Sequence, residues 1–301
     1  MQFYIAVAYQ EPDHLVRIAK AAEAAGFGGL VLSDHLIYPQ PLKTPYPYTR
    51  DGQPRWTAET PWPDPFVAIG AMAAVTSRIR FLTSIMVLPL RHPVLAAKTI
   101  ATAAVLSQGR LTLGVGAGWM KEEFDAIGQP FEGRGRRMLE SIEIMRALWT
   151  GGPVSHQGPH YAFDQITMSP RPPGPIRIYG GGRSKTALAR VAKHLDGWAS
   201  EIQTLQEVKE TAEYIHALRH GTEREGEPLG LCVAARDCLR LEQYQEAAGM
   251  GVSELVTVPW LFYGDESQPL EKKCEGIQRF GEEVLLPVQT ALRRSGKTSA
   301  F

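Results

Sequence analysis

The 301-residue sequence has little cysteine and no net charge. Its three cysteines, Cys232, Cys238 and Cys274, are widely spaced and odd in number, which fits neither a disulfide framework nor a zinc site. Basic and acidic residues number 32 each, so no strong field of one sign would attract nucleic acid or an anionic membrane. This balance still leaves room for a local basic pocket.

Long apolar runs and several familiar motifs are also missing. No stretch approaches the roughly 18 apolar residues of a membrane helix, and the N-terminal segment "MQFYIAVAYQEPDHL" lacks the pattern of a signal peptide. We therefore expect a cytoplasmic protein without membrane contact. The sequence contains no H-E-x-x-H, no G-x-S-x-G and no clustered carboxylates, so we expect neither a metal site nor a nucleophile mechanism.

Apolar residues make up 44% of the chain, and short apolar runs alternate with segments of helical periodicity. The expected strands are Phe3–Ala8, Gly28–His35, Ile79–Val87, Arg110–Val115, Ile176–Tyr179, Gly197–Ser200, Leu229–Arg236 and Val252–Pro259. The expected helices are His14–Gly26, Asp64–Thr76, Pro93–Ser107, Arg134–Thr150, Arg183–His194, Leu205–Arg219, Leu241–Gly249 and Leu270–Arg294. About eight alternating units favour an α/β fold of the closed (β/α)₈ TIM-barrel type over an open doubly wound sheet.

Two insertions interrupt this alternation within what we predict to be one domain spanning residues 1–301. Leu36–Pro63 contains seven prolines, and its aromatic residues include Tyr46, Tyr48, Trp56 and Trp62. A long loop of this kind is either a functional lid or a surface decoration. Pro153–Pro175 is also rich in proline and could form a small hairpin.

The active site of a TIM barrel lies at the C-terminal ends of its strands. Polar or small residues gather at these ends, namely Ser33, Asp34, His35, Ser84, Ile85, Gly114–Trp119, Tyr179–Ser184, Thr257 and Pro259. His35 is either an acid/base group or a structural histidine. Ser84 is a lone hydroxyl in an otherwise apolar strand.

Two glycine-rich strand ends suggest ligand contacts. "GGGRS", Gly180–Ser184, precedes a helix and offers free N–H groups and an arginine, which favours a phosphate site over a merely flexible turn. "GVGAGW", Gly114–Trp119, fails as a dinucleotide fingerprint because Trp119 stands at the third glycine position. Its small residues suggest that a flat ring packs there.

Three segments in this order resemble the bacterial luciferase-like monooxygenase superfamily. They are Ala21–His35, Asp64–Gly128 and Pro175–Trp198. The closest subgroup in pattern comprises oxidoreductases that depend on 8-hydroxy-5-deazaflavin (coenzyme F420). The resemblance implies a barrel with insertions at its C-terminal face, a homodimer, and either F420 or FMN as cofactor.

The resemblance also assigns expected roles to individual residues. It implies a bulge with a cis peptide at Ser84–Ile85 that backs the central ring, and it thereby accounts for the lone serine. Asp34 and His35 would be the catalytic residues facing the reactive edge of the ring. The remaining expected cofactor contacts are Val87, Gly116, Gly118, Gly180, Gly181, Gly182, Arg183 and Ser184. Trp119 replaces the acidic residue of the sugar-phosphate dehydrogenase branch, which argues against a sugar-phosphate substrate and leaves the general acid open.

These inferences predict a flavin-type oxidoreductase. We favour F420-dependent hydride transfer involving a small organic substrate, which the aromatic loop suggests to be largely apolar. The alternative is an FMN-dependent two-component monooxygenase supplied by a separate flavin reductase. A non-catalytic flavin-binding protein is a third possibility, which the intact pocket with His35 argues against.

Overall fold

The computed structural model describes residues 1–264 and 267–295 and contains a closed barrel of eight parallel strand units. The barrel order is β1, β2, β3, β5, β8, β9, β10 and β11, with β3 pairing to β5 and β11 pairing back to β1. The strands are β1 (Gln2–Ala6), β2 (Gly29–Leu32), β3 (Arg80–Thr83), β4 (Met86–Val87), β5 (Leu111–Gly116), β8 (Ile178–Gly181), β9 (Gly197–Gln203), β10 (Gly230–Ala235) and β11 (Glu254–Thr257). The short β4 continues β3 after a break and pairs with β5.

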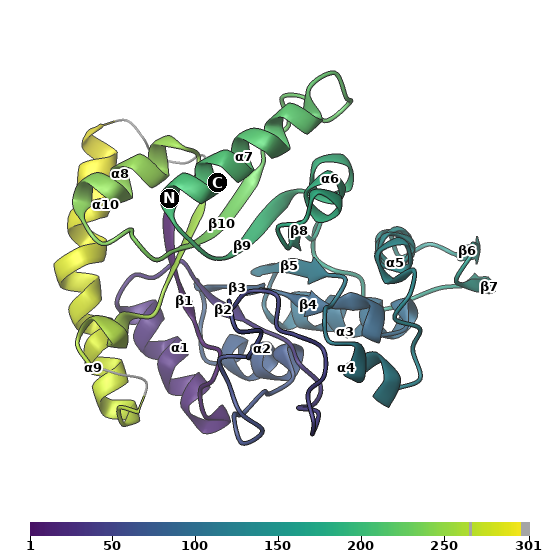
Figure 1. Cartoon of the computed structure of the whole chain (residues 1–301), viewed down its shortest axis with the longest axis horizontal. Coiled ribbons are helices and arrows are strands. Elements are labelled where there is room, and N and C mark those ends of the chain that lie inside the picture. The colour runs from purple at the N-terminus through teal and green to yellow at the C-terminus, as the bar shows by residue number, and fades with distance from the viewer. Residues whose placement is uncertain (265–266, 296–301) are drawn as a thin grey trace.

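Helices surround the barrel, as Figure 1 shows. They are α1 (Leu15–Ala24), α2 (Pro65–Ala73), α3 (Pro93–Leu106), α4 (Lys121–Ala126), α5 (Arg134–Leu148), α6 (Lys185–His194), α7 (Leu205–Arg219), α8 (Leu241–Gly249), α9 (Leu270–Phe280) and α10 (Leu286–Arg294). The predicted TIM barrel is confirmed, and each expected strand and helix is present with shifts of a few residues at its ends.

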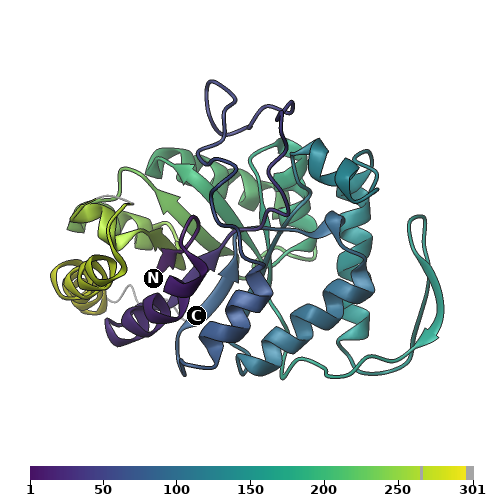
Figure 2. The ribbon, with the colours of Figure 1, turned by 90° about the horizontal axis from the view of Figure 1, so that it is seen from below.

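Four local features differ from the expected pattern or refine it. The expected strand Ile79–Val87 is interrupted between β3 and β4, and the last expected helix is divided by a π turn at Gly281–Leu285. The short α4 was not anticipated. The second insertion forms an antiparallel hairpin of β6 (Val154–Gln157) and β7 (Ala162–Ile166), as suggested, and it projects away from the barrel in Figures 1 and 2.

Aromatic side chains fill the N-terminal end of the barrel. Tyr4 and Tyr179 are almost completely buried there. Gly29 leaves the space that the Tyr4 ring occupies, and Gly230 leaves the space for Tyr179, because a Cβ at either glycine would collide with the ring opposite. The barrel interior is therefore a packed core at this end, and a ligand can enter only from the C-terminal face.

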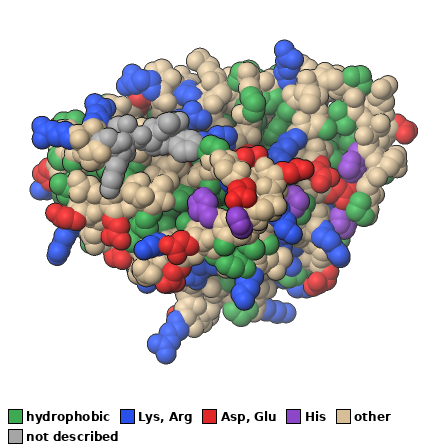
Figure 3. Space-filling model, turned by 90° about the horizontal axis from the view of Figure 1, so that it is seen from above, with side chains coloured by type: hydrophobic (Ala, Val, Ile, Leu, Met, Phe, Trp, Pro, Cys, Tyr) green, Lys and Arg blue, Asp and Glu red, His purple; other side chains and the backbone are tan. Residues whose placement is uncertain are grey.

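The first insertion, residues 36–63, rises over the C-terminal face of the barrel as an irregular loop (Figure 2). On the face of the molecule drawn in Figure 3, acidic and basic side chains are interspersed without a large region of one sign. No helix in the described part of the chain combines the length and apolar character needed to cross a bilayer.

Candidate active site

A cavity of about 900 Å³ opens at the C-terminal face of the barrel, a size typical of ligand pockets. It collects residues from the ends of β2, β4, β5, β8 and β9 and from the loop 36–63. The predicted site residues that line it are Ser33, Asp34, His35, Ser84, Ile85, Val87, Gly116, Gly118, Gly181, Gly182, Arg183 and Ser184. Gly180 is an exception, because its Cβ direction points at Val191 of α6 and at Leu195, which follows the helix.

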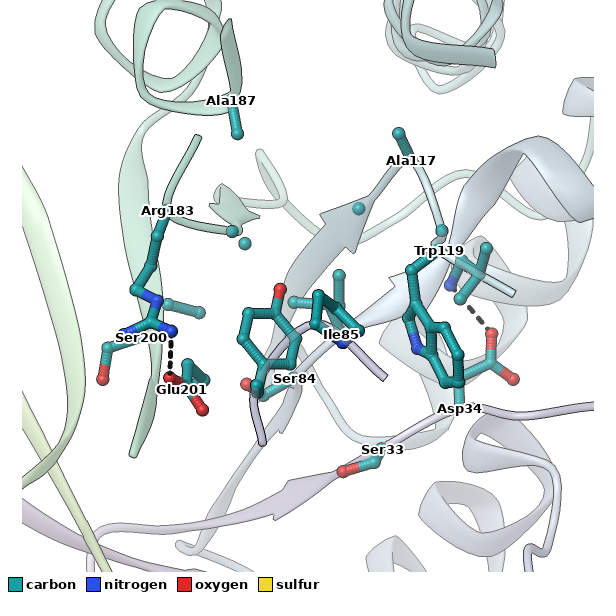
Figure 4. A pocket seen from close by; sticks show the side chains of 18 of the residues that line it. Ser33, Asp34, Ser84, Ile85, Ala117, Trp119, Arg183, Ala187, Ser200 and Glu201 are labelled. Carbon is teal, nitrogen blue, oxygen red and sulfur yellow. Dashed lines mark hydrogen bonds and ion pairs between the residues drawn. The ribbon is translucent and has the colours of Figure 1, made fainter. Parts of the chain in front are cut away.

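The floor of the cavity is the break between β3 and β4. The peptide bond between Ser84 and Ile85 is cis, as expected. The Ile85 side chain lies over the neighbouring strands, where a Cβ at Gly116 or Gly181 would collide with it. Figure 4 shows Ser84 and Ile85 at the centre of the pocket.

The packing of the bulge between β3 and β4 also explains why glycine stands at several positions in and just after β5. We predicted that they contact a flat ring, and Gly116 and Gly118 line the cavity. In addition, the Cβ positions of Gly114 and Gly116 are occupied by the Thr83 carbonyl and by Ile85. Gly118 has a φ of +82° and borders the Val87 and Phe124 side chains. These glycines allow the bulge between β3 and β4 to project into the barrel mouth, and the bulge presents Ile85 to the cavity.

Asp34 anchors this bulge from below. Its Oδ2 accepts hydrogen bonds from the Val87 backbone N–H at 2.9 Å and from Arg91 Nη1 at 2.6 Å, and its Oδ1 accepts one from Arg91 Nη2 at 2.9 Å. Only 4% of Asp34 is exposed. Because both carboxylate oxygens are engaged in a buried bidentate ion pair with Arg91, and one also binds the Val87 N–H, Asp34 fixes the position of β4.

His35 is held by an acidic residue from α4. Its Nδ1 lies 3.2 Å from Glu123 Oε1, which also accepts a hydrogen bond from the Leu36 backbone N–H at 2.7 Å. The Glu123 side chain is 1% exposed and that of His35 is 10% exposed. A carboxylate on Nδ1 orients an imidazole and leaves Nε2 for a ligand.

Aromatic rings enclose His35. The ring centroids of Trp56, Trp62 and Trp119 lie 4.9, 4.8 and 6.0 Å from that of His35. Tyr46 contacts both Trp56 and Trp119, with centroids 5.2 Å away in each case. This wall is largely apolar and excludes water from the imidazole.

The loop 36–63 supplies most of this wall and is tied to α4. Glu122 Oε1 accepts hydrogen bonds from the backbone N–H groups of Lys43 at 2.7 Å and Thr44 at 2.8 Å. Burial raises the pKa of the Glu122 carboxyl, but hydrogen bonds from its own backbone N–H, from the Thr44 side chain and from these loop N–H groups outweigh it and leave the pKa below its usual value. The hairpin insertion contributes no residue to the cavity lining, so the loop 36–63 is the insertion that covers the site.

The glycine-rich turn after β8 forms the opposite side of the cavity. Gly182 has a φ of +99°, a conformation that favours glycine, and Ser184 caps α6 by accepting a hydrogen bond from Ala187 N–H at 3.2 Å. Arg183 turns toward β9 and pairs with Glu201 at 3.2 Å, as Figure 4 shows. Burial raises the pKa of Glu201, although Arg183 opposes this.

Three further arginines line the cavity, two from the first turn of α5 and one from the middle of α6. We call Arg134, Arg136 and Arg190 the arginine cluster. Their side chains form no ion pair with a carboxylate of any described residue. The cluster, Glu123, Glu201 and Arg91 were all missed in the sequence. The cluster had a readable signal, since "RGRR" opens a helix, where acidic residues are normally preferred.

Among the described residues, no group of histidine, cysteine, aspartate or glutamate is arranged to hold a metal ion. What the cavity does offer is a central hydrophobic floor, a histidine in an aromatic enclosure on one side, and a glycine-rich turn with basic residues on the other. These features define a TIM-barrel enzyme whose pocket fits a flat-ring redox cofactor with an anionic substituent.

Comparison with known sequences specifies the family. The model of the luciferase-like monooxygenase family matches residues 3–263, and the chain belongs to this family. An uncharacterized protein of Mycobacterium tuberculosis (strain ATCC 25618 / H37Rv) is 33% identical over 96% of this chain and 100% of its own length. The F420-dependent glucose-6-phosphate dehydrogenase of Nakamurella multipartita is 32% identical over 72% of this chain and 60% of its own length.

Solved structures agree on the fold. The F420-dependent tetrahydromethanopterin reductase of Methanopyrus kandleri superimposes with a TM-score of 0.70 at 17% identity, covering 95% of this chain and 99% of its own. The monooxygenase RslO1 of Streptomyces bottropensis gives a TM-score of 0.69 at 19% identity, with the same coverage of 95% and 99%. The chain is accordingly a luciferase-like oxidoreductase, and its cofactor is of the flavin or deazaflavin type.

Proposed function

We propose that the enzyme transfers a hydride between coenzyme F420 and a small, largely apolar organic substrate. The observation that carries this proposal is the His35–Glu123 pair, which stands inside the aromatic wall and beside the Ile85 floor. Relatives whose printed names state F420 dependence, with 32% and 36% identity, support the choice of cofactor.

In this proposal, different residues of the chain support the ring, position the bulge and transfer the proton. Ile85 supports the ring, and Asp34 keeps the bulge in place through Val87 and Arg91. A bound deazaflavin would supply or accept the hydride at the carbon that replaces N5 of a flavin. His35 gives a proton to the substrate, or takes one from it, through Nε2, while Glu123 holds Nδ1. Because Asp34 is fully engaged, we assign it a positioning role and not proton transfer.

The walls indicate what kind of substrate fits. Trp56, Trp62 and Trp119 offer broad apolar surfaces next to His35, whereas the Arg183–Glu201 pair is the polar feature on the far side of Ile85. Such walls favour an organic molecule with a flat or apolar body over a sugar phosphate. Closure of the loop 36–63 keeps water away from the reacting atoms.

FMN-dependent monooxygenation with a separate flavin reductase is the second candidate. The enclosed aromatic wall supports this candidate as well, because oxygenation by a flavin also requires a pocket that excludes water. A deazaflavin does not perform this chemistry, so the identity of the cofactor decides between the two candidates.

Titration of the apo-protein with FMN and with F420, each oxidised and reduced, tests the proposal. We expect F420 to bind more tightly than FMN in both redox states, measured by fluorescence quenching. Tight binding of reduced FMN together with no measurable F420 binding would replace this proposal with the monooxygenase.

We also propose that the enzyme is a homodimer that buries the outer faces of α2 and α3. The two helices pack side by side, and both are apolar on nearly all sides, with Lys98 as their one charged residue. Val67 is nevertheless 75% exposed and Leu95 68% exposed. Helices of this kind are normally covered. Sedimentation should give a dimer for the wild type and a monomer for the double variant Val67→Glu and Leu95→Glu, and a monomeric wild type would refute the proposal.

A further inference from the structure

The arginine cluster is electrostatically unbalanced. Arg190 makes no hydrogen bond and no ion pair within residues 1–264 and 267–295, although it is half-buried. Arg134 donates only to the backbone carbonyls of Gly118 and Phe131. Arg136 is exposed at the rim of the same cavity. Three cations thus share one end of the pocket, and none of them forms an ion pair with a carboxylate of a described residue.

The pKa values of the half-buried arginines reflect how unfavourable their environment is for a positive charge. Burial lowers the pKa of Arg134, the nearby Glu132 carboxylate opposes this, and the charges of Arg190 and Arg137 lower it further. Burial also lowers the pKa of Arg190. Two other arginines near the site have carboxylate partners, because Arg91 pairs with Asp34 and Arg183 with Glu201. Half-buried cations of like sign are normally kept only where an anion completes the site.

The cluster is also in a specific place relative to the glycine-rich turn. Arg190 follows Ser184 by six residues on α6, which corresponds to roughly 9 Å along the helix axis. The small Ala187 lies between them and lines the cavity. Gly135 leaves room for the Arg190 guanidinium, because a Cβ at this position would collide with it. An anionic group bound by the cluster therefore lies several bonds beyond a phosphate bound at the turn.

We propose that Arg134, Arg136 and Arg190 bind the carboxylates of the oligoglutamate tail of F420, beyond the phosphate held at Gly181–Ser184. This inference rests on the proposed F420 dependence. FMN ends at its phosphate and has no group that reaches the cluster once the phosphate occupies the turn. In F420 the phosphate is a diester that continues through a lactyl group into glutamates. The cluster consequently makes affinity depend on the tail.

Deazaflavins of three lengths test the proposal: F420 with several glutamates, the phospholactyl form without glutamate, and 8-hydroxy-5-deazariboflavin without phosphate. Dissociation constants come from fluorescence anisotropy, so no substrate is required. We expect the affinity of the wild type for glutamylated F420 to be about tenfold or more higher than its affinity for the phospholactyl form. This difference should shrink as salt is added. The variant with Arg136→Gln and Arg190→Gln should lose this difference and keep its affinity for the phospholactyl form.

The control variant is Lys193→Gln, which removes a positive charge from the same helix at an exposed position outside the cavity. It should bind all three ligands like the wild type. Arg136→Gln alone, at an exposed position, covers the case in which the double variant is poorly folded, and it should lose part of the tail effect. Equal losses for the glutamylated and phospholactyl forms would mean that the arginines hold the phosphate, and this overturns the proposal.

The experiment also separates this proposal from the proposed function. If the wild type binds all phosphate-bearing deazaflavins equally, the tail site is refuted while F420 dependence stands. If it binds no deazaflavin and binds FMN, both proposals fail.

Discussion

The attachment of the loop 36–63 to α4 can be tested without knowing the substrate. Glu122 Oε1 receives two backbone N–H groups of the loop, at 2.7 and 2.8 Å. We expect Glu122→Ala to release this part of the loop while leaving the barrel folded. Glu122→Gln keeps an acceptor oxygen but removes the charge, so its effect should be smaller.

The magnitude follows from these two contacts. A hydrogen bond to a charged group contributes about 1.5–3 kcal/mol. Because the loop N–H groups regain water when the loop opens and Glu122 is only partly buried, we expect the two bonds together to contribute less than this sum, about 2 kcal/mol for the pair. The open population of the loop should then rise about 30-fold.

Trypsin under native conditions provides the assay, because Arg50 and Arg55 lie within the loop. Where opening and closing are fast, the cleavage rate follows the open population, so the rate in Glu122→Ala should also rise about 30-fold. Trp56, which is 6% exposed, should shift its emission to longer wavelength.

The matched control is Asp125→Ala on the same helix. Asp125 pairs with Lys121 on the surface, where both side chains are more than half exposed. Such a pair contributes at most about 1 kcal/mol, and its loss should not change cleavage of the loop. Wild-type cleavage in Glu122→Ala would refute the attachment. An equal loss of global stability would show that Glu122 supports the barrel and not the loop.

Three other predictions address the ring edge, the phosphate turn and the barrel frame. His35→Ala should lower kcat by ~10²–10⁴ with cofactor affinity unchanged, and full activity would return His35 to a structural role. Arg183→Ala with Ser184→Ala should weaken cofactor binding by about 1–3 kcal/mol in a calorimetric titration, and an unchanged dissociation constant would exclude the turn. Burial raises the pKa of Glu23, but backbone N–H groups, that of Ile79 foremost, lower it to about 2. Since the folded pKa is depressed, Glu23→Gln should destabilise the protein by about 1–3 kcal/mol at pH 7 in urea unfolding. That difference should disappear as the pH falls from about 4.5 toward 2, and a difference independent of pH would exclude the charge as its source.

The barrel was predictable because its signals are local. Each strand is a short apolar run, each helix has a clear period, and parallel topology brings the strand ends to one face. His35, Ser84 and Gly182 could therefore be placed at the cavity from sequence alone. The cis peptide at Ser84–Ile85 was expected from the family resemblance and is present.

The contacts across the site were not predictable in the same way. Glu123 binds His35 from 88 residues further along the chain, on a helix of only six residues, too short to show a periodic pattern. A sequence also cannot show that Ile85 fills the space beside Gly116, so this packing role of the glycine was not anticipated. The ion pair between Arg183 and Glu201 joins residues from two different strand ends. Local sequence patterns do not show how close these strand ends lie.

One oxygen of Glu123 holds two neighbouring residues with different tasks. It binds the ring of His35, and it accepts the backbone N–H of Leu36, the first residue of the loop. A swing of the loop that withdraws Leu36 pulls on the same carboxylate that aligns the imidazole. In the mechanism we propose, closing the loop over the pocket and aligning His35 for proton transfer therefore occur together, and we expect the enzyme to be inactive while the loop is open.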